Sequence, residues 1–266
     1  MKQRIITGGI GGIIFLSLVY AGEEWYSLLI VLLASIGLYE FLRMAGLRLF
    51  SFAGLVGYVL MMSLIWPSLY FSNLVPIGTG GSTSLLLPAL FLLLFYTVVR
   101  KNQFQIEHAA LTLVGALYIG FGFTYIAATR NFSPDGFYLT MLVLLGIWAT
   151  DSGAYFVGRA IGKTKLWPSI SPNKTVEGAL GGLILGFVVI VGIDLWFAVL
   201  PLSKAILIGF VTGIAGQFGD LVESAIKRHY DVKDSGHIFP GHGGVMDRVD
   251  SWIVVFPILH FLHLLS

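Results

Sequence analysis

Long apolar runs are the feature that most constrains this chain. A helix needs about 20 mainly apolar residues to cross the hydrocarbon core of a bilayer, and it satisfies its own backbone hydrogen bonds there. Runs of suitable length occupy residues 5–21, 25–42, 52–70, 84–99, 108–129, 137–151, 176–199, 204–221 and 249–265. Only 11% of the 266 residues are charged, whereas soluble domains have about 25%. The sequence therefore predicts an all-α, polytopic integral membrane protein with about nine transmembrane helices.

The basic residues predict how these spans are oriented. Counted across nine spans, 14 of the 16 Lys and Arg residues fall on the same side as the N-terminus, and only Arg130 and Lys204 fall on the other. Loops rich in Lys and Arg stay in the cytoplasm. We therefore expect a multi-pass protein of the inner (cell) membrane, with its N-terminus in the cytoplasm and its C-terminus outside. Two polar loops, 152–175 and 222–248, are then cytoplasmic.

Polar residues also divide the chain into two regions. Residues 1–106 have short connections and few polar groups, whereas residues 107–266 contain both polar loops and most of the acids. We expect a transmembrane scaffold with oligomer contacts in the first region and a catalytic transmembrane region in the second.

The chain has no cysteine, which excludes disulfides, thiolate nucleophiles and cysteine metal sites.

Glycines recur at three- and four-residue spacing in two of the expected helices. They are Gly178, Gly182, Gly186, Gly209, Gly213, Gly216 and Gly219. Small residues at this spacing let membrane helices approach closely, so helix packing is the favoured interpretation. The alternative is that they make room for a lipid chain or another ligand.

The second polar loop is flanked by acids. Asp220 precedes it, and Asp247 and Asp250 follow three residues apart, so a helix starting near residue 246 places both carboxylates on one face. They could simply cap a helix, because its N-terminus favours negative charge. They could also bind Mg²⁺, which commonly takes one or two carboxylates together with substrate phosphates. Basic residues suited to phosphate groups lie in the same segment, namely Lys227, Arg228, Lys233 and Arg248.

The first polar loop contains two candidate phosphate sites. Gly162-Lys163-Thr164 lacks the spacing of a P-loop and follows an expected membrane helix rather than a strand, so we reject that motif. Ser171-Pro172 is typical of an N-cap and first helical residue, which would place Lys174 and Thr175 in the first turn of the next helix. A helix N-terminus with these side chains can bind phosphate; the alternative is a basic topology marker on a capped helix.

Four further acids are expected to have minor roles. Glu40, Glu107 and Glu223 lie near inner helix ends, and Glu223 precedes Lys227 by four residues, a favourable helical pair. Asp194 is expected to face water near the outer end of its helix.

The two polar loops together resemble the CDP-diacylglycerol synthases, also called phosphatidate cytidylyltransferases. The family's C-terminal signature appears as Ser224, Ile226, Lys227-Arg228, Lys233-Asp234, Gly236, Pro240, His242-Gly243-Gly244, Asp247-Arg248 and Asp250. The family's other cytoplasmic stretch resembles Asp151-Ser-Gly-Ala-Tyr155, Gly158-Arg159 and Ser171-Pro-Asn-Lys-Thr-Val-Glu-Gly178. Residues 151–250 carry the resemblance, while the N-terminal half is similar to the family only in hydropathy.

The resemblance implies that CTP and phosphatidic acid react to give CDP-diacylglycerol and pyrophosphate. It implies Mg²⁺, with room for a second cation such as K⁺, a homodimer in the lipid membrane, and no nucleic-acid partner. Under this hypothesis the metal ligands are Asp220, Asp247 and Asp250, and these act in catalysis together with Lys227 and Arg228. The expected substrate-binding residues are Lys174, Thr175, Ser224, Lys233, His242, Arg248 and Asp151.

Two other functions are compatible with part of this pattern. Another CTP-using membrane lipid kinase would share the metal and basic groups, but it would release CDP instead of pyrophosphate. An anionic-solute transporter would be expected to show internal repeats and polar residues at mid-membrane, whereas here the acids gather at inner helix ends.

Overall fold

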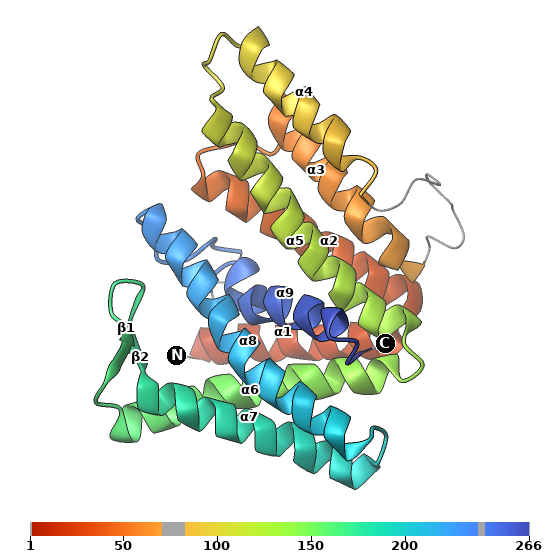
Figure 1. Cartoon of the computed structure of the whole chain (residues 1–266), viewed down its shortest axis with the longest axis vertical. Coiled ribbons are helices and arrows are strands. Elements are labelled where there is room, and N and C mark those ends of the chain that lie inside the picture. The colour runs from red at the N-terminus through yellow and green to blue at the C-terminus, as the bar shows by residue number, and fades with distance from the viewer. Residues whose placement is uncertain (1, 71–82, 239–242, 266) are drawn as a thin grey trace. The chain divides into compact units, whose positions relative to one another are not determined.

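The computed structural model describes residues 2–70, 83–238 and 243–265 (Figure 1). Within these ranges the elements are α1 (Lys2–Ala21), α2 (Glu23–Met44), α3 (Phe52–Ile65), η1 (Trp66–Ser68), α4 (Leu86–Val99), α5 (Ile106–Phe132), α6 (Gly136–Ile161), β1 (Lys165–Trp167), β2 (Ser171–Thr175), α7 (Val176–Phe197), α8 (Leu202–His229) and α9 (Met246–Phe261). Each α-helix overlaps one predicted range. Among the described residues, α2, α5, α6, α7 and α8 are long and apolar enough to cross a membrane. The all-α membrane class is confirmed, and the nine spans and their orientation stay predictions.

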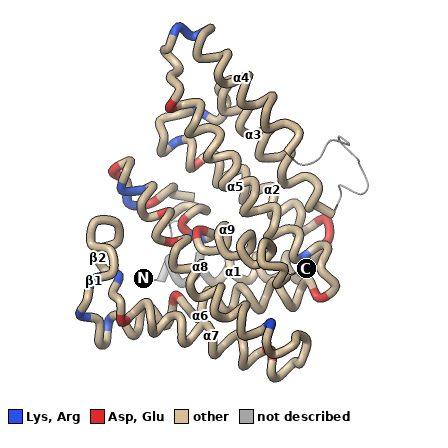
Figure 2. The backbone as a smooth tube through the Cα atoms, viewed as in Figure 1, with Lys and Arg blue, Asp and Glu red and all other residues tan. Residues whose placement is uncertain are grey.

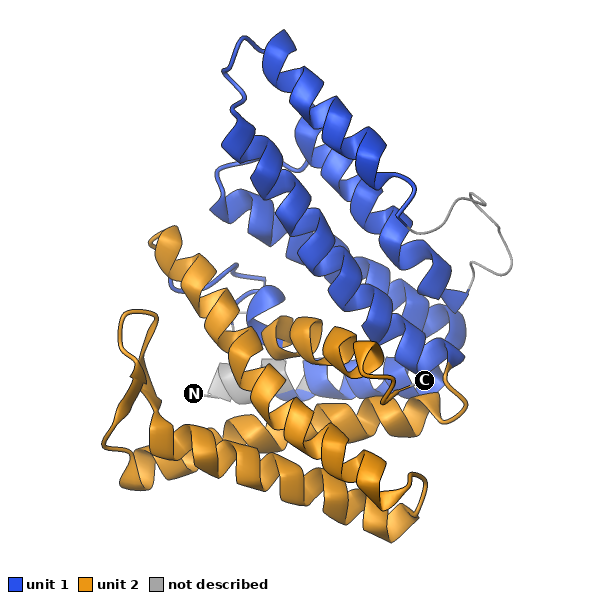
Figure 3. Ribbon diagram, in the orientation of Figure 1, with its two compact units in different colours: residues 1–132, 232–248 blue, residues 133–231, 249–266 orange. Residues whose placement is uncertain are grey.

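The first compact unit comprises residues 1–132 and 232–248 (Figure 3). Its helices α2, α3, α4 and α5 pack through small residues. A Cβ on Gly115 of α5 would lie 2.5 Å from the ring of Phe41 on α2, and a Cβ on Gly57 of α3 would lie 2.7 Å from Thr112 on α5. Because any side chain there would push the helices apart, these glycines set the spacing of the bundle.

The second compact unit comprises residues 133–231 and 249–266. Its helices α6 and α7 touch along their backbones, since a Cβ on Gly178 would lie 2.7 Å from the carbonyl of Ala154 and one on Gly182 would lie 2.5 Å from that of Thr150. On α8, Gly213 faces Leu183 of α7. The prediction that the glycines serve helix packing is therefore confirmed.

The polar loops are more ordered than the sequence suggested. Helix α6 continues to Ile161 and α8 to His229, about ten and eight residues beyond their predicted ends. Residues 165–175 form an antiparallel hairpin in which Lys165 pairs with Thr175. Polar sequence can remain helical once a helix leaves the hydrocarbon, because water satisfies its side chains.

The predicted cap of the seventh helix at Ser171-Pro172 is wrong, whereas the apolar run correctly predicted that this helix begins at residue 176. Ser171 and Pro172 belong to strand β2, and Thr175 is the N-cap, its hydroxyl accepting a hydrogen bond from the amide of Gly178 at 3.1 Å. Proline fits an extended edge strand as well as the first turn of a helix, so the Ser-Pro pair did not distinguish them.

The amides of Lys163 and Thr164 donate to the carboxylate of Glu177. This arrangement is unlike a P-loop and supports rejecting that motif.

Asp194 is buried rather than facing water, so that expectation is also wrong. Only 2% of the residue is exposed. One carboxylate oxygen accepts hydrogen bonds from the hydroxyl of Tyr138 at 2.7 Å and from the amide of Leu200 at 3.0 Å. Asp194 therefore ties the turn between α7 and α8 to α6.

Charge lies mainly at helix ends (Figure 2). The middles of α4, α5 and α7 carry no charged residue, whereas the last turn of α8 contains Lys227 and Arg228. The boundary between the compact units, after Phe132, differs from the functional boundary expected after residue 106. The division into scaffold and catalytic regions remains a prediction.

Candidate functional site

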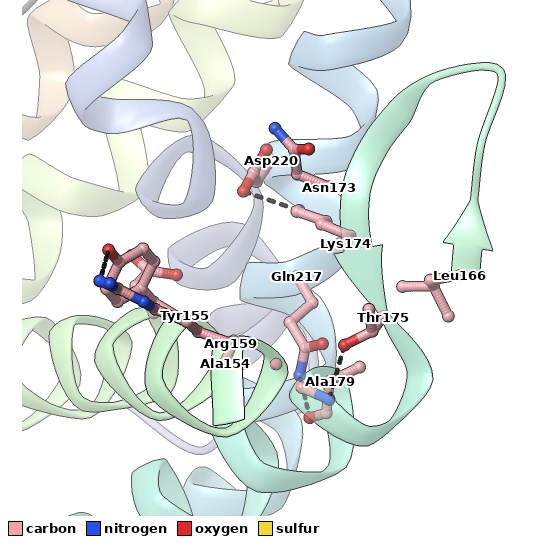
Figure 4. Close-up of a pocket in the computed structure, with 13 residues that line it drawn as sticks. Ala154, Tyr155, Arg159, Leu166, Asn173, Lys174, Thr175, Ala179, Gln217 and Asp220 are labelled. Atoms are coloured by element: carbon pink, nitrogen blue, oxygen red, sulfur yellow. Dashed lines mark hydrogen bonds and ion pairs between the residues drawn. The ribbon is translucent and has the colours of Figure 1, made fainter. Parts of the chain in front are cut away.

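A cavity of about 450 Å³ lies in the second unit, among α6, the β1–β2 hairpin, α7 and α8 (Figure 4). Pockets for small molecules commonly measure ~300–1,000 Å³, so the cavity suits a compact polar ligand. The polar and charged side chains that line it are those of Asp151, Tyr155, Arg159, Asn173, Lys174, Thr175, Gln217 and Asp220.

An ion pair joins two walls of this cavity. The ammonium group of Lys174 on β2 lies 2.7 Å from a carboxylate oxygen of Asp220 on α8, and Figure 4 shows the two side chains pointing toward each other. The other oxygen of Asp220 accepts a hydrogen bond from the hydroxyl of Ser224, one helical turn later, at 3.1 Å. Both side chains of the pair are partly exposed, at 25% and 34%. A partly exposed pair contributes little to stability, so it can be exchanged when a ligand enters.

Two further carboxylates, those of Asp151 and Asp250, lie near this ion pair. Asp220 and Asp151 lie close enough to Asp250 for their negative charges to repel its own, and Lys227 lies close enough to attract it. These acids come from α6, α8 and α9. Like charges that converge in a partly buried place are costly unless a cation or a proton neutralises them, so the arrangement is suited to either.

Close packing of α8 on α9 places Asp250 beside Asp220. A Cβ on Gly219 would lie 2.7 Å from the carbonyl oxygen of Asp250 and 2.9 Å from Cα of Ser251. The hydroxyl of Ser251 donates to the carbonyl of Gly216 at 3.0 Å. The glycines of α8 thus allow backbone contact where the two acids meet.

The acidic groups fit an incomplete metal site. Among the described residues, no three acidic or histidine side chains form a full set of metal ligands. Mg²⁺ usually takes only one or two carboxylates from the protein and completes its coordination with water and substrate phosphates. Two carboxylates beside a cavity lined with basic residues therefore suit a metal that binds together with a phosphorylated ligand.

The predicted basic residues of α8 are held in different ways. Lys227 pairs with Glu223 at 2.8 Å, as its helical spacing predicted, and only 1% of the Glu223 side chain is exposed. The guanidinium of Arg228 donates to the carbonyl of Ile170, at the tip of the hairpin, at 3.3 Å. Arg228 therefore links the end of α8 to the segment that carries Lys174.

Several cavity residues were not predicted to belong to the site. Tyr155 and Arg159 follow Asp151 at four-residue spacing, and the guanidinium of Arg159 donates to the hydroxyl of Tyr155 at 3.1 Å. The four-residue spacing could have identified Tyr155 and Arg159 as site residues, but only if α6 had been predicted to continue past residue 151. The side-chain amide nitrogen of Gln217 donates to the carbonyls of Ala179 and Gly213.

The predicted acid Asp247 lies in the first unit, in the first turn of α9. One of its oxygens accepts hydrogen bonds from the amide and the hydroxyl of Ser235, both at 2.9 Å, and from the amide of Gly244 at 2.8 Å. These bonds come from residues that precede α9, and they fix the turn that leads into the helix. The start of α9 at Met246 agrees with the prediction.

Two other expected phosphate contacts, Lys233 and Arg248, have exposed side chains in the first unit. His242 lies outside the described residues. The structure thus brings together Asp151, Lys174, Thr175, Asp220, Ser224, Lys227, Arg228 and Asp250 within the second unit. The roles of Lys233, His242, Asp247 and Arg248 in binding stay predictions.

Comparison with known proteins covers nearly the whole chain. Residues 2–266 match the model of the family described as the cytidylyltransferase family. A phosphatidate cytidylyltransferase of Bacillus subtilis (strain 168) is 45% identical over 263 residues, which are 98% of this chain and 97% of that protein. Proteins of the same name from Staphylococcus haemolyticus and Staphylococcus saprophyticus are 41% and 40% identical, each over 98% of both chains.

Proposed function

The chain belongs to the cytidylyltransferase family, and from this we propose that it transfers CMP from CTP to phosphatidic acid, giving CDP-diacylglycerol and pyrophosphate. The observation that carries the proposal is the Lys174–Asp220 pair in a cavity that Asp151 and Arg159 also line, with Asp250 close to Asp220. Such a site suits a triphosphate bound with a cation. The relatives' shared name, over nearly the full length of the chain, supports the same reaction.

In the proposed reaction an oxygen of the lipid's phosphate attacks the α-phosphorus of CTP. The bond between that phosphorus and the oxygen bridging to the β-phosphate breaks, and pyrophosphate leaves with the bonding electrons. A phosphate monoester has a second pKa near ~6 and is largely ionised at neutral pH, so the chain need not supply a general base. Its residues have two tasks: to align the two phosphates and to neutralise their charge.

Side chains of the second unit are suited to both tasks. Lys174 and Arg159 line the cavity from opposite elements, and Lys227 lies near Asp250. These cations would hold the triphosphate, with Lys174 exchanging the carboxylate of Asp220 for a phosphate oxygen. Thr175 keeps the N-terminus of α7 in place and so directs its backbone dipole at the same cavity. Arg228, Lys233, His242 and Arg248 are proposed as further phosphate contacts.

The donor set around Asp220 and Asp250 fits Mg²⁺, with Asp151 and Asp247 as further candidate ligands. When bound there, Mg²⁺ would supply Lewis-acid stabilisation of the negative charge that develops on the departing pyrophosphate. Ser224 would then orient Asp220 through the hydrogen bond it already donates. A second cation, such as K⁺, could share the carboxylates.

The proposed site faces the cytoplasm of a cell membrane crossed nine times, with the N-terminus inside and the C-terminus outside. CTP would arrive from water, and phosphatidic acid would present its headgroup while its acyl chains stay in the bilayer. The distribution of Lys and Arg supports this orientation. The proposed assembly is a homodimer, the commonest symmetric oligomer.

The transfer is tested by following each phosphate of CTP separately. Purified chain in phosphatidic acid micelles receives Mg²⁺ and CTP labelled at either the α- or the γ-phosphorus. Label from the α-position should appear in the lipid, and label from the γ-position should appear in pyrophosphate. A kinase would instead put γ-label in lipid and release CDP, and a transporter would accumulate CTP in proteoliposomes without turnover.

Replacing Lys174 by glutamine should weaken CTP binding without unfolding the chain. The value of kcat/KM for CTP should fall about 10- to 100-fold, because a hydrogen bond to a charged group contributes about 1.5–3 kcal/mol. Lys165→Gln, on the exposed neighbouring strand, is the matched control and should behave like wild type. An equal loss of kcat/KM in both variants would indicate that the total positive charge of the hairpin is responsible, and not the particular position of Lys174.

A further inference from the structure

A buried glutamate organises the signature segment from a distant helix. Glu40 lies on α2, and only 1% of it is exposed. Its carboxylate accepts hydrogen bonds from the backbone amide of Val245 at 3.0 Å and from that of Met246 at 2.9 Å. Those two residues lead into and begin α9. The N-terminus of α9, whose first amides have no partner within the helix, is thus satisfied by a side chain about 200 positions earlier in the sequence.

The same carboxylate is connected to Asp247 through one hydroxyl group. The hydroxyl of Ser235 lies 3.2 Å from an oxygen of Glu40 and 2.9 Å from an oxygen of Asp247, and it is placed to donate to either. The amide of Ser235 also donates to Asp247. Glu40, Ser235 and Asp247 therefore form one network, and a change at Glu40 reaches Asp247 through a single intermediate.

Two glycines of the signature enclose the Glu40 carboxylate. A Cβ on Gly236 or on Gly244 would collide with the carboxylate oxygens. Gly236 and Gly244 lie so close to the Glu40 carboxylate that neither position has room for a residue larger than glycine. Burying a carboxylate is costly unless it is fully hydrogen-bonded, and helix packing alone would be served as well by an apolar residue. The hydrogen bonds of Glu40 therefore indicate that the position of the segment leading into α9 is itself important.

We propose that Glu40 is a positioning residue: it fixes the first turn of α9 and thereby the direction in which Asp247 presents its carboxylate to the cation and nucleotide. The inference rests on the proposed function for the identity of the ligand. It requires no contact between Glu40 and either substrate.

The test compares Glu40→Gln with Glu107→Gln, an exposed glutamate of the same unit. Glutamine keeps the size of Glu40 but directs an NH₂ group at one of the donors that the carboxylate satisfies. Hydrogen exchange of the purified chain, followed by mass spectrometry without ligand, should show faster exchange in residues 243–248 of Glu40→Gln, and unchanged exchange in α3 and α5. The half-saturating Mg²⁺ concentration should rise about 10- to 100-fold, the usual cost of removing a partner that orients a metal ligand.

Two further variants keep the proposal testable if Glu40→Gln does not fold. Ser235→Ala removes only the hydroxyl that connects the two acids, and it should raise the half-saturating Mg²⁺ concentration in the same direction. Glu40→Asp retains the charge and should recover part of the wild-type Mg²⁺ response. Uniformly faster exchange throughout the chain, or an unchanged Mg²⁺ response in Ser235→Ala and Glu40→Asp, would overturn the proposal. If wild type makes no CDP-diacylglycerol, the proposed function fails, and the exchange measurement still judges the positioning role.

Discussion

Replacing Asp220 or Asp250 by asparagine should lower kcat/KM by about 10²–10³-fold, the range for removing one electrostatic group that stabilises a transition state. Each substitution keeps the size of the side chain and removes its charge. Asp220 lines the cavity and pairs with Lys174, and Asp250 lies close enough to Lys227 to be attracted by its positive charge. The half-saturating Mg²⁺ concentration should rise together with the loss of turnover, because both carboxylates are proposed to hold the ion.

The double variant gives a sharper result than either single one. Residues that act as a unit show losses of activity that do not add. The Asp220→Asn, Asp250→Asn double variant should therefore have about the same kcat/KM as the less active of the two single variants. Asp231→Asn is the control: Asp231 is exposed, it follows the end of α8, and its φ of 52° suits asparagine. Wild-type turnover in both single variants, at unchanged Mg²⁺ dependence, would remove these acids from the site.

Gly219→Ala is the second substitution with a large expected effect. The added Cβ would lie 2.7 Å from the carbonyl oxygen of Asp250, where only a backbone shift can relieve the contact. Moving α8 away from α9 separates Asp220 from Asp250, and misplacement by about 1 Å can cost ~10²-fold in rate. We therefore expect kcat/KM to fall by about that factor, with a lower Tm in detergent from an overpacking cost of about 1–3 kcal/mol.

Gly216→Ala, one turn earlier on α8, provides the matched comparison. Its Cβ would lie 3.7 Å from a methyl group of Val255, an ordinary contact. Alanine also favours the helix over glycine by ~1 kcal/mol, so Tm should stay the same or rise and activity should persist. If both variants retain activity, the close approach at Gly219 does not set the geometry of the acids.

The helices were predictable because apolar runs of membrane length admit few other structures. The start of α9 at Met246 followed from the two acids near its first turn, and the Glu223–Lys227 pair followed from four-residue spacing. The ends of α6 and α8 were missed because hydropathy detects where a helix leaves the hydrocarbon, which is not where the helix stops.

The contacts that build the site were mostly beyond sequence reasoning. Lys174 meets Asp220 across 46 positions, and Glu40 meets Met246 across 206. Such pairs depend on which helices become neighbours, and no local spacing encodes that. Asp194 was assigned to water for the same reason: its partner Tyr138 lies on another helix. A polar residue in an apolar helix signals a buried partner, but the partner itself appears only in the fold.

The proposed site depends on Asp220 of α8 and Asp250 of α9 holding a divalent cation together with the nucleotide's phosphates. Mn²⁺, a paramagnetic substitute for Mg²⁺, tests it by electron paramagnetic resonance with a non-hydrolysable CTP analogue. Wild type should bind Mn²⁺ tightly only when the nucleotide is present, and the Asp220→Asn, Asp250→Asn double variant should lose this binding. Equal Mn²⁺ binding by wild type and a folded double variant would contradict it.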